Sequence, residues 1–305
     1  YMIPRENIYI LDTKVKQELE YVTCLENCQT VFLMDSNNYI SKTEISVAKD
    51  MKNIEIKAKE LLEALIIDGV NENKIPNGFR SIIPSGTKIN NIKYENGLLI
   101  VDFSKELLEI NEEYEEKMIS AIIYTLTNIK DINKIQIKVE GVVLTKLPKT
   151  NVVLPEYLTK SFGINKSYDL IDTSNITNVT VYYLNEYNNK YYYVPVTKYV
   201  NDSKDKIKII IDELSSGPIY ESNLMSFLNT NAKLLNYSID NGIATLNFND
   251  YIFSDMKSKN ILEEVVYGIA YSIYDNYEVK EVVFMHDNEK VVDCVNNVCS
   301  KKKKN

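Results

Sequence analysis

Residues 81–104 read SIIPSGTKINNIKYENGLLIVDFS, and residues 226–249 read SFLNTNAKLLNYSIDNGIATLNFN. The two stretches align without a gap, and their hydrophobic positions and Asn-Gly steps coincide. A second pair of blocks, 119–141 and 266–288, aligns at nearly the same offset. Repetition inside a sequence is the signature of a repeated structural unit, so we predict that the 305 residues contain one unit twice.

Each Asn-Gly step predicts a β-hairpin with a two-residue turn. Both central residues of such a turn need positive φ, which Asn and Gly tolerate. Counting outward from the turn fixes the residue pairs, and strand alternation then defines one apolar face. The predicted pairs are Tyr94–Leu99, Ile92–Val101, Ile239–Ala244 and Tyr237–Leu246, with Phe103 and Phe248 continuing that face.

The opposite face of each hairpin mixes polar and apolar side chains. Because strand side chains alternate, this face points away from the helices that cover the apolar one. We predict it to be the interaction face for a partner. It carries Lys93, Glu95, Leu98, Ile100 and Asp102 in the first copy, and Ser238, Asp240, Ile243, Thr245 and Asn247 in the second.

Helices flank each hairpin in the predicted unit. Apolar residues recur at helical spacing after the hairpin, and another apolar stripe precedes Gly69, a predicted helix stop. Residues 207–211 read equally well as a strand, but the repeat and the Gly217-Pro218 step favour a helix. The stripes are Met118, Ile119, Ile122 and Leu126; Val265, Val266, Ile269 and Ile273; and Ala58, Leu61, Leu62, Leu65 and Ile66.

Each copy therefore reads strand, strand, helix, hairpin, helix, strand, with last strands at 134–140 and 281–285. This order predicts an α+β sandwich with helices on one face of a small mixed sheet, and not a doubly wound parallel sheet. We divide the chain into an extension (1–30), a first domain with a trailing segment (31–170), a linker (171–178), a second domain (179–293) and a Cys-containing basic tail (294–305).

Composition excludes several function classes. The net charge of −8 gives no support to phosphate-backbone binding, so nucleic acid is not an expected partner. A single histidine cannot build a His-based triad or a two-His metal site. No apolar run approaches the ~20 residues of a membrane-spanning helix. Cys24 follows a charged stretch, so we reject it as a lipidation cysteine.

The cysteines form two couples, Cys24 with Cys28 and Cys294 with Cys299. The Cys-x2-Cys spacing of a zinc knuckle is absent, which disfavours a metal site. Disulfides are expected if the protein is exported. Pairing is either local within each couple or between the two ends of the chain, and we hypothesise local bridges.

Four further features admit both a chemical and a structural interpretation. Asp102 with Glu95 offers an acid-base pair, but a hydrogen-bonding role for Asp102 is the stronger hypothesis. His286, followed by Asp287, offers a metal or acid-base role, but a surface-loop histidine is the stronger hypothesis. The tyrosines of 182–193 predict a hairpin with cross-strand aromatic packing, and sugar or peptide stacking is the alternative. Lys301–Lys304 suit an anionic membrane or wall polymer, or a solvated tail.

Several runs in the first copy resemble a GerMN domain. The second copy departs from the pattern, because Asn229-Thr230-Asn231-Ala232 replaces a Pro-x-Gly-Thr turn and Asn247 replaces an aspartate. The resembling runs are Pro84-Ser85-Gly86-Thr87, Asn96-Gly97, Val101-Asp102-Phe103-Ser104, Tyr124-Thr125-Leu126-Thr127, the strand 134–141 and the trailing segment 154–165.

The resemblance implies a sporulation and germination lipoprotein of endospore-forming bacteria, with no known catalytic residues and no cofactor. The GerMN fold is similar to ring-building motifs, so the implied role is a scaffold in the envelope between mother cell and forespore. Its implied partners are sporulation envelope proteins, peptidoglycan and, through a lipid anchor, the membrane; it is also expected to be capable of oligomerisation. A peptidoglycan-binding module is the alternative, and a wall-cleaving enzyme using Asp102 and Glu95 ranks third.

Overall fold

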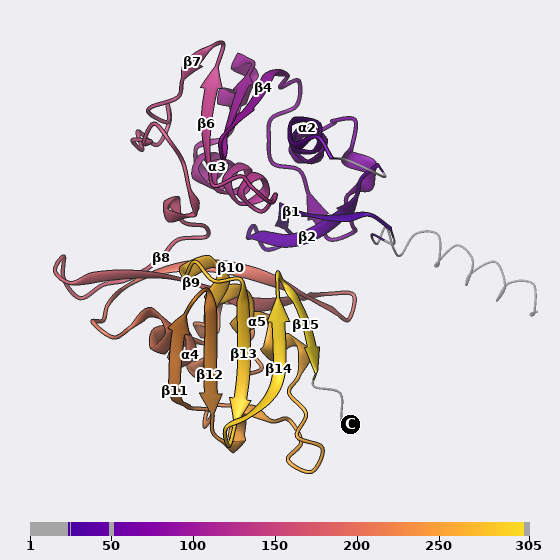
Figure 1. Ribbon diagram of the computed structural model, residues 1–305. Coiled ribbons are helices and arrows are strands. Elements are labelled where there is room, and N and C mark those ends of the chain that lie inside the picture. Colours follow the sequence, from indigo (N-terminus) through magenta and orange to yellow (C-terminus); the bar gives the residue numbers. More distant parts are fainter. Residues whose placement is uncertain (1–23, 25, 49–51, 302–305) are drawn as a thin grey trace, which may run out of the picture. The chain divides into compact units, whose positions relative to one another are not determined.

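The computed structural model describes residues 24, 26–48 and 52–301. The chain divides into two compact units between Thr159 and Lys160 (Figure 1). In the described part of the chain, each unit contains two α-helices and two sets of strands, in the same order along the chain. The repeat in the sequence is therefore a repeat of structure.

The first unit begins with an antiparallel pair and continues with a mixed sheet. In the mixed sheet the central pair β5–β6 is parallel and its neighbours are antiparallel, in the order β4-β5-β6-β7. The strands are β1 (Cys28–Asp35), β2 (Ile40–Ser46), β3 (Phe79–Arg80), β4 (Ile89–Glu95), β5 (Leu98–Phe103), β6 (Lys134–Val139) and β7 (Val142–Val143); β3 pairs with β1.

Helices α2 (Ile54–Leu65) and α3 (Glu112–Thr127) form the middle layer of the first unit. Helix α3 contacts both β1 and β6, and α2 contacts both β1 and β4. The unit is thus built of sheet, helices and sheet (Figure 1). Short 3-10 helices connect the elements: η1 (Glu72–Lys74) and η2 (Lys105–Glu109) here, and η3 (Lys160–Phe162), η4 (Tyr220–Ser222) and η5 (Asp250–Ile252) in the second unit.

The second unit repeats this plan with longer strands. A hairpin of β9 (Ile176–Tyr187) and β10 (Lys190–Asn201) corresponds to β1 and β2, and β8 (Ser167–Asp169) pairs parallel with β10. Helices α4 (Lys206–Ser216) and α5 (Glu263–Asn276) pack on β9. The mixed sheet has the order β11 (Leu234–Asp240), β12 (Ile243–Phe248), β13 (Glu281–His286), β14 (Glu289–Val295) and β15 (Val298–Lys301).

The predicted hairpin registers are confirmed. Tyr94 faces Leu99 and Ile92 faces Val101, while the second copy repeats all its predicted pairs. Both hairpins also carry an irregularity at the same place, Ile89/Asn91 and Leu234/Asn236. A two-residue turn sets the register of every pair outward from it until a bulge intervenes, which explains why counting was sufficient.

The predicted helices and the α+β class are confirmed, including the helix over 207–211, which ends with Gly217 at φ +79°. All residues of the two stripes that follow the hairpins are buried. The helices cover one face of each mixed sheet, as predicted. In addition, the first strands of each copy form a separate layer on the other side of the helices, which the sequence did not indicate.

The same buried hydrogen bond joins strand and helix in both units. The Phe32 amide of β1 donates to Thr125 Oγ1 of α3 at 3.0 Å. The Tyr182 amide of β9 donates to Ser272 Oγ of α5 at 2.9 Å. Each helix thus uses a hydroxyl side chain to satisfy a strand amide in the core.

Several of the predicted boundaries differ from the structure. The assigned extension (1–30) includes the start of β1 at Cys28, and the assigned linker (171–178) lies within the second unit and includes the start of β9 at Ile176. Residues 160–170 were assigned to the first domain, but they belong to the second unit: β8 pairs with β10, and Lys160 Nζ lies 2.6 Å from Asp275 Oδ1 of α5. Residues 294–301 were assigned to a tail, but they end β14 and form β15 of the second sheet. Strand β8 pairs with a distant part of the chain, and β15 is short. Neither stretch alternates polar and apolar residues clearly enough to predict a strand.

The segment after β7 is fastened to α3. The Glu115 carboxylate is almost fully buried and accepts hydrogen bonds from the Lys149 amide at 3.1 Å and the Thr150 amide at 2.7 Å. Leu158 then pairs with Ile135 at the end of the segment. The trailing segment is therefore an integral part of the first unit up to Thr159.

Candidate interaction surfaces

The outer face of the first mixed sheet carries the predicted interaction residues of the first copy. Lys93 pairs with Ile100 and Glu95 with Leu98 in the β4–β5 register, so these side chains share one face. Lys93 Nζ lies 3.2 Å from Glu95 Oε2, with both side chains well exposed. Exposed ion pairs of this kind contribute little to stability and leave the charges available to a partner.

Strand β6 adds residues that the sequence analysis did not assign to this face. The parallel β5–β6 register places Lys134 beside Leu98, Gln136 beside Ile100 and Lys138 beside Asp102. The first outer face is thus defined by Lys93, Glu95, Leu98, Ile100, Asp102, Lys134, Gln136 and Lys138, of which Gln136 is buried. Alternation in 134–138 was visible in the sequence, but only the register shows which strand it joins.

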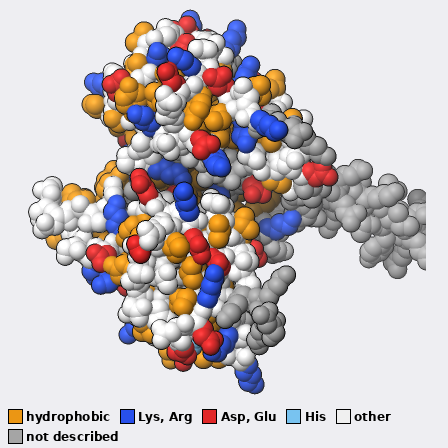
Figure 2. Space-filling view, in the orientation of Figure 1, with side chains coloured by type: hydrophobic (Ala, Val, Ile, Leu, Met, Phe, Trp, Pro, Cys, Tyr) orange, Lys and Arg blue, Asp and Glu red, His pale blue; other side chains and the backbone are white. Residues whose placement is uncertain are grey.

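The outer face of the second mixed sheet has the opposite charge balance. Its predicted members Asp240, Ile243 and Thr245 lie on one face with Ser238 and Asn247, of which Asn247 is buried. Strands β13 and β14 add Glu281, Val283, Met285, Lys290 and Asp293. Figure 2 shows acidic, basic and apolar side chains interspersed on this unit. Where β6 carries Lys134 and the buried Gln136, β13 carries Glu281 and the buried Val283.

Three charged groups are close together on the second outer face. Lys290 Nζ forms an ion pair with Asp293 and lies 4.0 Å from Glu281 Oε1. A hydrogen bond with the neighbouring Asp293 carboxylate, together with burial, raises the pKa of Glu281, and Lys290 opposes this shift. The acidic pair therefore favours the protonated form of Glu281 more than solvent alone would.

Asp102, the candidate acid of the sequence, has a structural hydrogen bond. Its Oδ1 accepts from the Gly141 amide at 2.8 Å, in the turn between β6 and β7 where Glu140 and Gly141 both have positive φ. Its proposed partner Glu95 instead forms an ion pair with Lys93. The two carboxylates are thus engaged in different contacts and do not form a pair around a common reaction centre.

His286 is buried, so its prediction as a surface-loop residue is wrong. It ends β13 on the same face as Val282 and Phe284, which point into the core. Its Nε2 lies 2.6 Å from Asp250 Oδ1, and its ring packs edge-on against Phe253. Nδ1 is 3.3 Å from Asp287 but lacks hydrogen-bond geometry. Strand alternation from Phe284 to His286 was the signal for this.

The tyrosine-rich stretch forms the β9–β10 hairpin, as predicted, but not with the predicted packing. The register sets Tyr193 opposite Leu184 and Tyr192 opposite Asn185, so aromatic rings do not face each other across the strands. Instead Tyr193 packs edge-on against Tyr271 of α5 at 5.1 Å between ring centroids. These rings fasten the hairpin to the helix layer.

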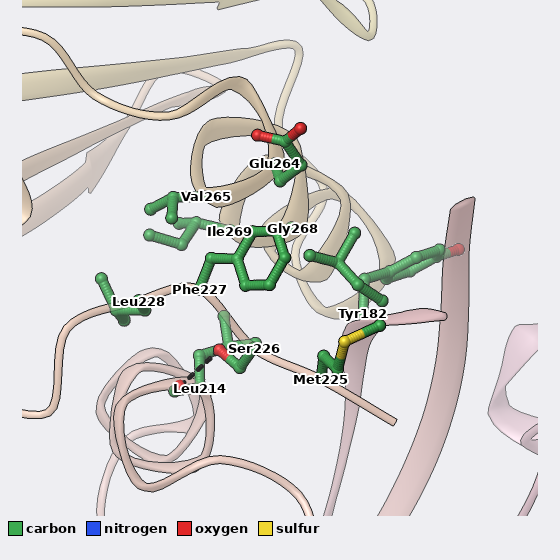
Figure 3. A pocket seen from close by; sticks show the side chains of 11 residues that line it. Tyr182, Leu214, Met225, Ser226, Phe227, Leu228, Glu264, Val265, Gly268 and Ile269 are labelled. Atoms are coloured by element: carbon green, nitrogen blue, oxygen red, sulfur yellow. Dashed lines mark hydrogen bonds between the residues drawn. The ribbon is translucent and has the colours of Figure 1, made fainter. Parts of the chain in front are cut away.

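A small hollow lies between α4, α5 and β9 in the second unit (Figure 3). The segment 225–228 crosses it, held by paired backbone hydrogen bonds between Met225 and Leu184. Its lining is mainly apolar, and Ser226 Oγ donates to the Leu214 carbonyl at 2.5 Å. Glu264 lies at its edge (Figure 3). The hollow is therefore a small gap in the packing of these elements, and the Ser226 hydroxyl already donates its hydrogen bond within the protein.

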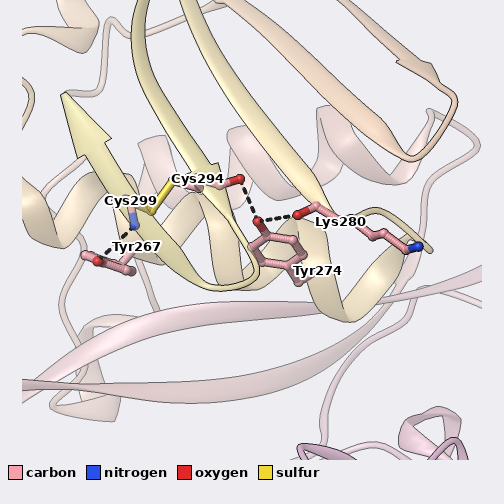
Figure 4. Close-up of a disulfide and its surroundings, with 5 residues drawn as sticks. All are labelled: Tyr267, Tyr274, Lys280, Cys294 and Cys299. Atoms are coloured by element: carbon pink, nitrogen blue, oxygen red, sulfur yellow. Dashed lines mark hydrogen bonds between the residues drawn. A yellow bond between two sulfur atoms is a disulfide. The ribbon is translucent and has the colours of Figure 1, made fainter. Parts of the chain in front are cut away.

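Both disulfides are local, which confirms the hypothesised pairing: Cys24–Cys28 and Cys294–Cys299. The second joins directly opposed residues of β14 and β15. Two tyrosines of α5 support it (Figure 4): Tyr274 donates to the Cys294 carbonyl at 2.8 Å, and Tyr267 accepts from the Cys299 amide at 3.2 Å. The disulfide therefore fixes the last strand of the sheet to its neighbour and to the helix layer.

The remaining candidates add no chemical centre. Within residues 24–301, the masked positions apart, no cluster of three or more His, Cys, Asp or Glu residues could hold a metal ion. No helix in the described part of the chain could span a membrane. Lys301 lies in β15 and contacts Asn260, whereas Lys302–Lys304 of the predicted anionic-surface run lie outside the described residues.

Known proteins share this arrangement. A family model described as Germane, sporulation and spore germination, matches residues 30–145 and 180–292, one match in each unit. The chain belongs to the Germane family. Over 257 residues the Germane chain is 34% identical to the spore germination protein GerM of Bacillus subtilis (strain 168), covering 83% of this chain and 69% of the relative.

A solved structure agrees with this membership. The tandem GerMN domains of the sporulation protein GerM from Bacillus subtilis match with a TM-score of 0.77 and 31% identity, covering 86% of this chain and 91% of that chain. The first GerMN domain of that protein, alone, matches with 27% identity and a TM-score of 0.41, covering 44% of this chain and 98% of its own. The expected tandem GerMN layout of the Germane chain, and its link to sporulation and germination, are confirmed.

Proposed function

We propose that this protein is a non-enzymatic scaffold of sporulation that acts outside the cytoplasm, at the envelope between mother cell and forespore. The observation that carries the proposal is the pair of outer sheet faces. Each is an array of strand side chains, with Lys134 and Lys138 on β6 and Glu281 on β13. Arrays of this kind suit contact with proteins, since electrostatic complementarity selects partners.

Two further observations support the proposal. Local disulfides such as Cys294–Cys299 are typical of proteins that fold in an oxidising compartment, which favours export. Asp102 and Glu95, the acids considered for wall cleavage, have structural contacts with Gly141 and Lys93. Anchoring by a lipid group is part of the proposal, and rests on the family resemblance.

The proposal places partners on the first outer face. Reversing charge with Lys134→Glu and Lys138→Glu should lower the yield of heat-resistant spores, because a partner selected by those lysines no longer fits. Lys59→Glu on the exposed surface of α2 is the matched control and should leave the yield unchanged. In parallel, pull-down from sporulating cells should recover envelope proteins with the parent chain and lose them with the reversed face.

Two outcomes would contradict the scaffold. Pelleting of the purified protein with clean cell wall, in the absence of other proteins, would indicate the peptidoglycan-binding module instead. Release of soluble muropeptides from that wall would indicate an enzyme. An unchanged spore yield for the charge-reversed variant, with the fold intact by circular dichroism, would remove the first outer face as the working surface.

A further inference from the structure

The two units differ at the edge strand of their mixed sheets. Strand β4 is the first strand of one sheet and β11 is the first strand of the other, so each has one side without a neighbouring strand in its own sheet. An unpaired strand edge presents amide and carbonyl groups that can pair with another chain. Whether it does so depends on what blocks the edge.

In the first unit the edge is blocked in two ways. The outward-pointing amide of Tyr94 donates to Glu55 Oε1 of α2 at 2.8 Å, and α2 packs along β4. Next to it, Lys93 is an exposed lysine in the middle of the strand. Inserting a lysine is a common way to prevent edge-to-edge pairing, because a second copy would place like charges together.

In the second unit neither block is present. The repeat places Ser238 where the first copy has Lys93, and Ile239 where it has Tyr94. Ser238 is exposed and Ile239 is 38% exposed. Among the described residues, no side chain accepts a hydrogen bond from the Ile239 amide as Glu55 does from that of Tyr94.

The hairpin register shows which groups of β11 point outward. Asp240 and Ile243 flank the two-residue turn, and such flanking residues exchange both of their backbone hydrogen bonds. The direction alternates along the strand, so Tyr237 and Ile239 direct their amide and carbonyl groups to the open edge. The Tyr237 ring is held in place because its hydroxyl bonds to Asp205 and Lys208 lies over its face.

We propose that β11 pairs antiparallel with β11 of a second copy of this chain, about a two-fold axis that passes beside Ser238. In this register Tyr237 of each copy exchanges backbone hydrogen bonds with Ile239 of the other. On one face each Tyr237 ring lies beside an Ile239 side chain, a favourable aromatic and β-branched pair. On the other face Asn236 lies beside Asp240, so no like charges are opposed.

The occupant is a second copy because the strand is complementary to itself in this register. The symmetric contact is closed, so the product is a dimer with a continuous sheet and not a filament. The proposal concerns only the chain itself and does not depend on the sporulation partners of the outer faces.

Sedimentation velocity of the full chain over a concentration series tests the dimer. The parent chain should show a concentration-dependent monomer–dimer equilibrium, and Ser238→Lys should weaken it about tenfold or more, because it opposes two lysines at the axis. Ser238 is exposed, so at concentrations low enough for both proteins to be monomeric the variant should keep the parent melting temperature. A parent chain that stays monomeric, or a dimer unchanged by Ser238→Lys, would overturn the proposal.

A cross-link tests the axis itself. Residues opposed at the centre of this pairing have Cα atoms about 4.5 Å apart, within the range that a disulfide bridges. Ser238→Cys should therefore give a covalent dimer under mild oxidation, whereas Lys93→Cys at the blocked edge should not. Equal cross-linking of both variants would indicate random collision and refute the pairing. Capture of a different protein by Ser238→Cys in sporulating cells, in place of the second copy, would refute it as well.

Discussion

The Asp102 carboxylate accepts a 2.8 Å hydrogen bond from the amide of Gly141. This contact joins the end of β5 to the turn after β6, so Asp102, the candidate catalytic acid of the first outer face, has a structural role. We therefore expect different effects from Asp102→Asn and Asp102→Ala.

We expect Asp102→Asn to leave the unfolding free energy within about 0.5 kcal/mol of the parent, because the Asn oxygen can still accept from Gly141. Asp102→Ala removes the acceptor and should cost about 1 kcal/mol. Urea unfolding measures both. Spore formation should be normal with Asp102→Asn; a defective spore phenotype together with an intact fold would restore Asp102 as a chemical residue.

The paired hydroxyls of the two units give a second prediction. Ser272→Ala leaves the Tyr182 amide buried without an acceptor, which should lower stability by about 1–3 kcal/mol. Thr125→Val should do the same to the first unit, through the Phe32 amide. Ser215→Ala, at a partly exposed helix position, is the control and should change little. Equal stability of Ser272→Ala and Ser215→Ala would show that the buried bond is dispensable.

The acidic pair on the second outer face predicts a pH-dependent effect of Glu281→Gln. The neighbouring Asp293 raises the pKa of Glu281 in the folded state above its ordinary value of 4.5. The folded state therefore binds this proton more tightly than the unfolded state, and stability falls as pH rises from 4.5 through the folded pKa. At a pH above the pKa of Glu281 in both the folded and the unfolded state, this loss of stability is complete.

Glu281→Gln removes that loss, so the variant should be more stable than the parent near pH 7, and the difference should vanish below about pH 4.5. Thermal melts across pH measure it. Glu278→Gln, at an exposed position just before β13, should show no such trend. A variant that is destabilised at neutral pH would mean that Lys290 outweighs Asp293.

The disulfide between β14 and β15 should contribute about 2 kcal/mol, since it closes a short loop. Cys294→Ala with Cys299→Ala should lose this stability, and reduction of the parent should reproduce the loss. The matched double variant Cys24→Ala with Cys28→Ala should retain the response to reductant. If the parent and the Cys294/Cys299 variant melt alike, the bridge has no stabilising role.

The parts of the fold that sequence could predict are those set by local rules. The Asn96-Gly97 and Asn241-Gly242 turns determine their strand pairs by counting, and both registers are as predicted. The helix at 207–211 was assigned from the repeat, because an apolar run of that length has no period of its own. The pairing of the disulfides was also predicted correctly, because both join cysteines that are close together in the sequence.

The parts that were wrong depend on distant contacts or on a missed turn. Strand β8 is only Ser167–Asp169, and it exists because β10 is there to pair with it. Strand β15 follows the Asn296-Asn297 turn, whose residues both have positive φ, a signal present in the sequence but not used. Only half of each outer sheet face was predicted, since the residues of β6 and β13 join it through parallel pairing across a helix connection.

The exchange of Lys134 on β6 for Glu281 on β13 gives the tandem a direction. Two identical copies would offer the same contact twice, and a neighbour could then attach at either place. Under the scaffold proposal, the difference in charge between the two sheets means that each would select a different neighbour, so the order of the copies along the chain would matter. Such a molecule would link two unlike components in a defined order, which a symmetric connector cannot do.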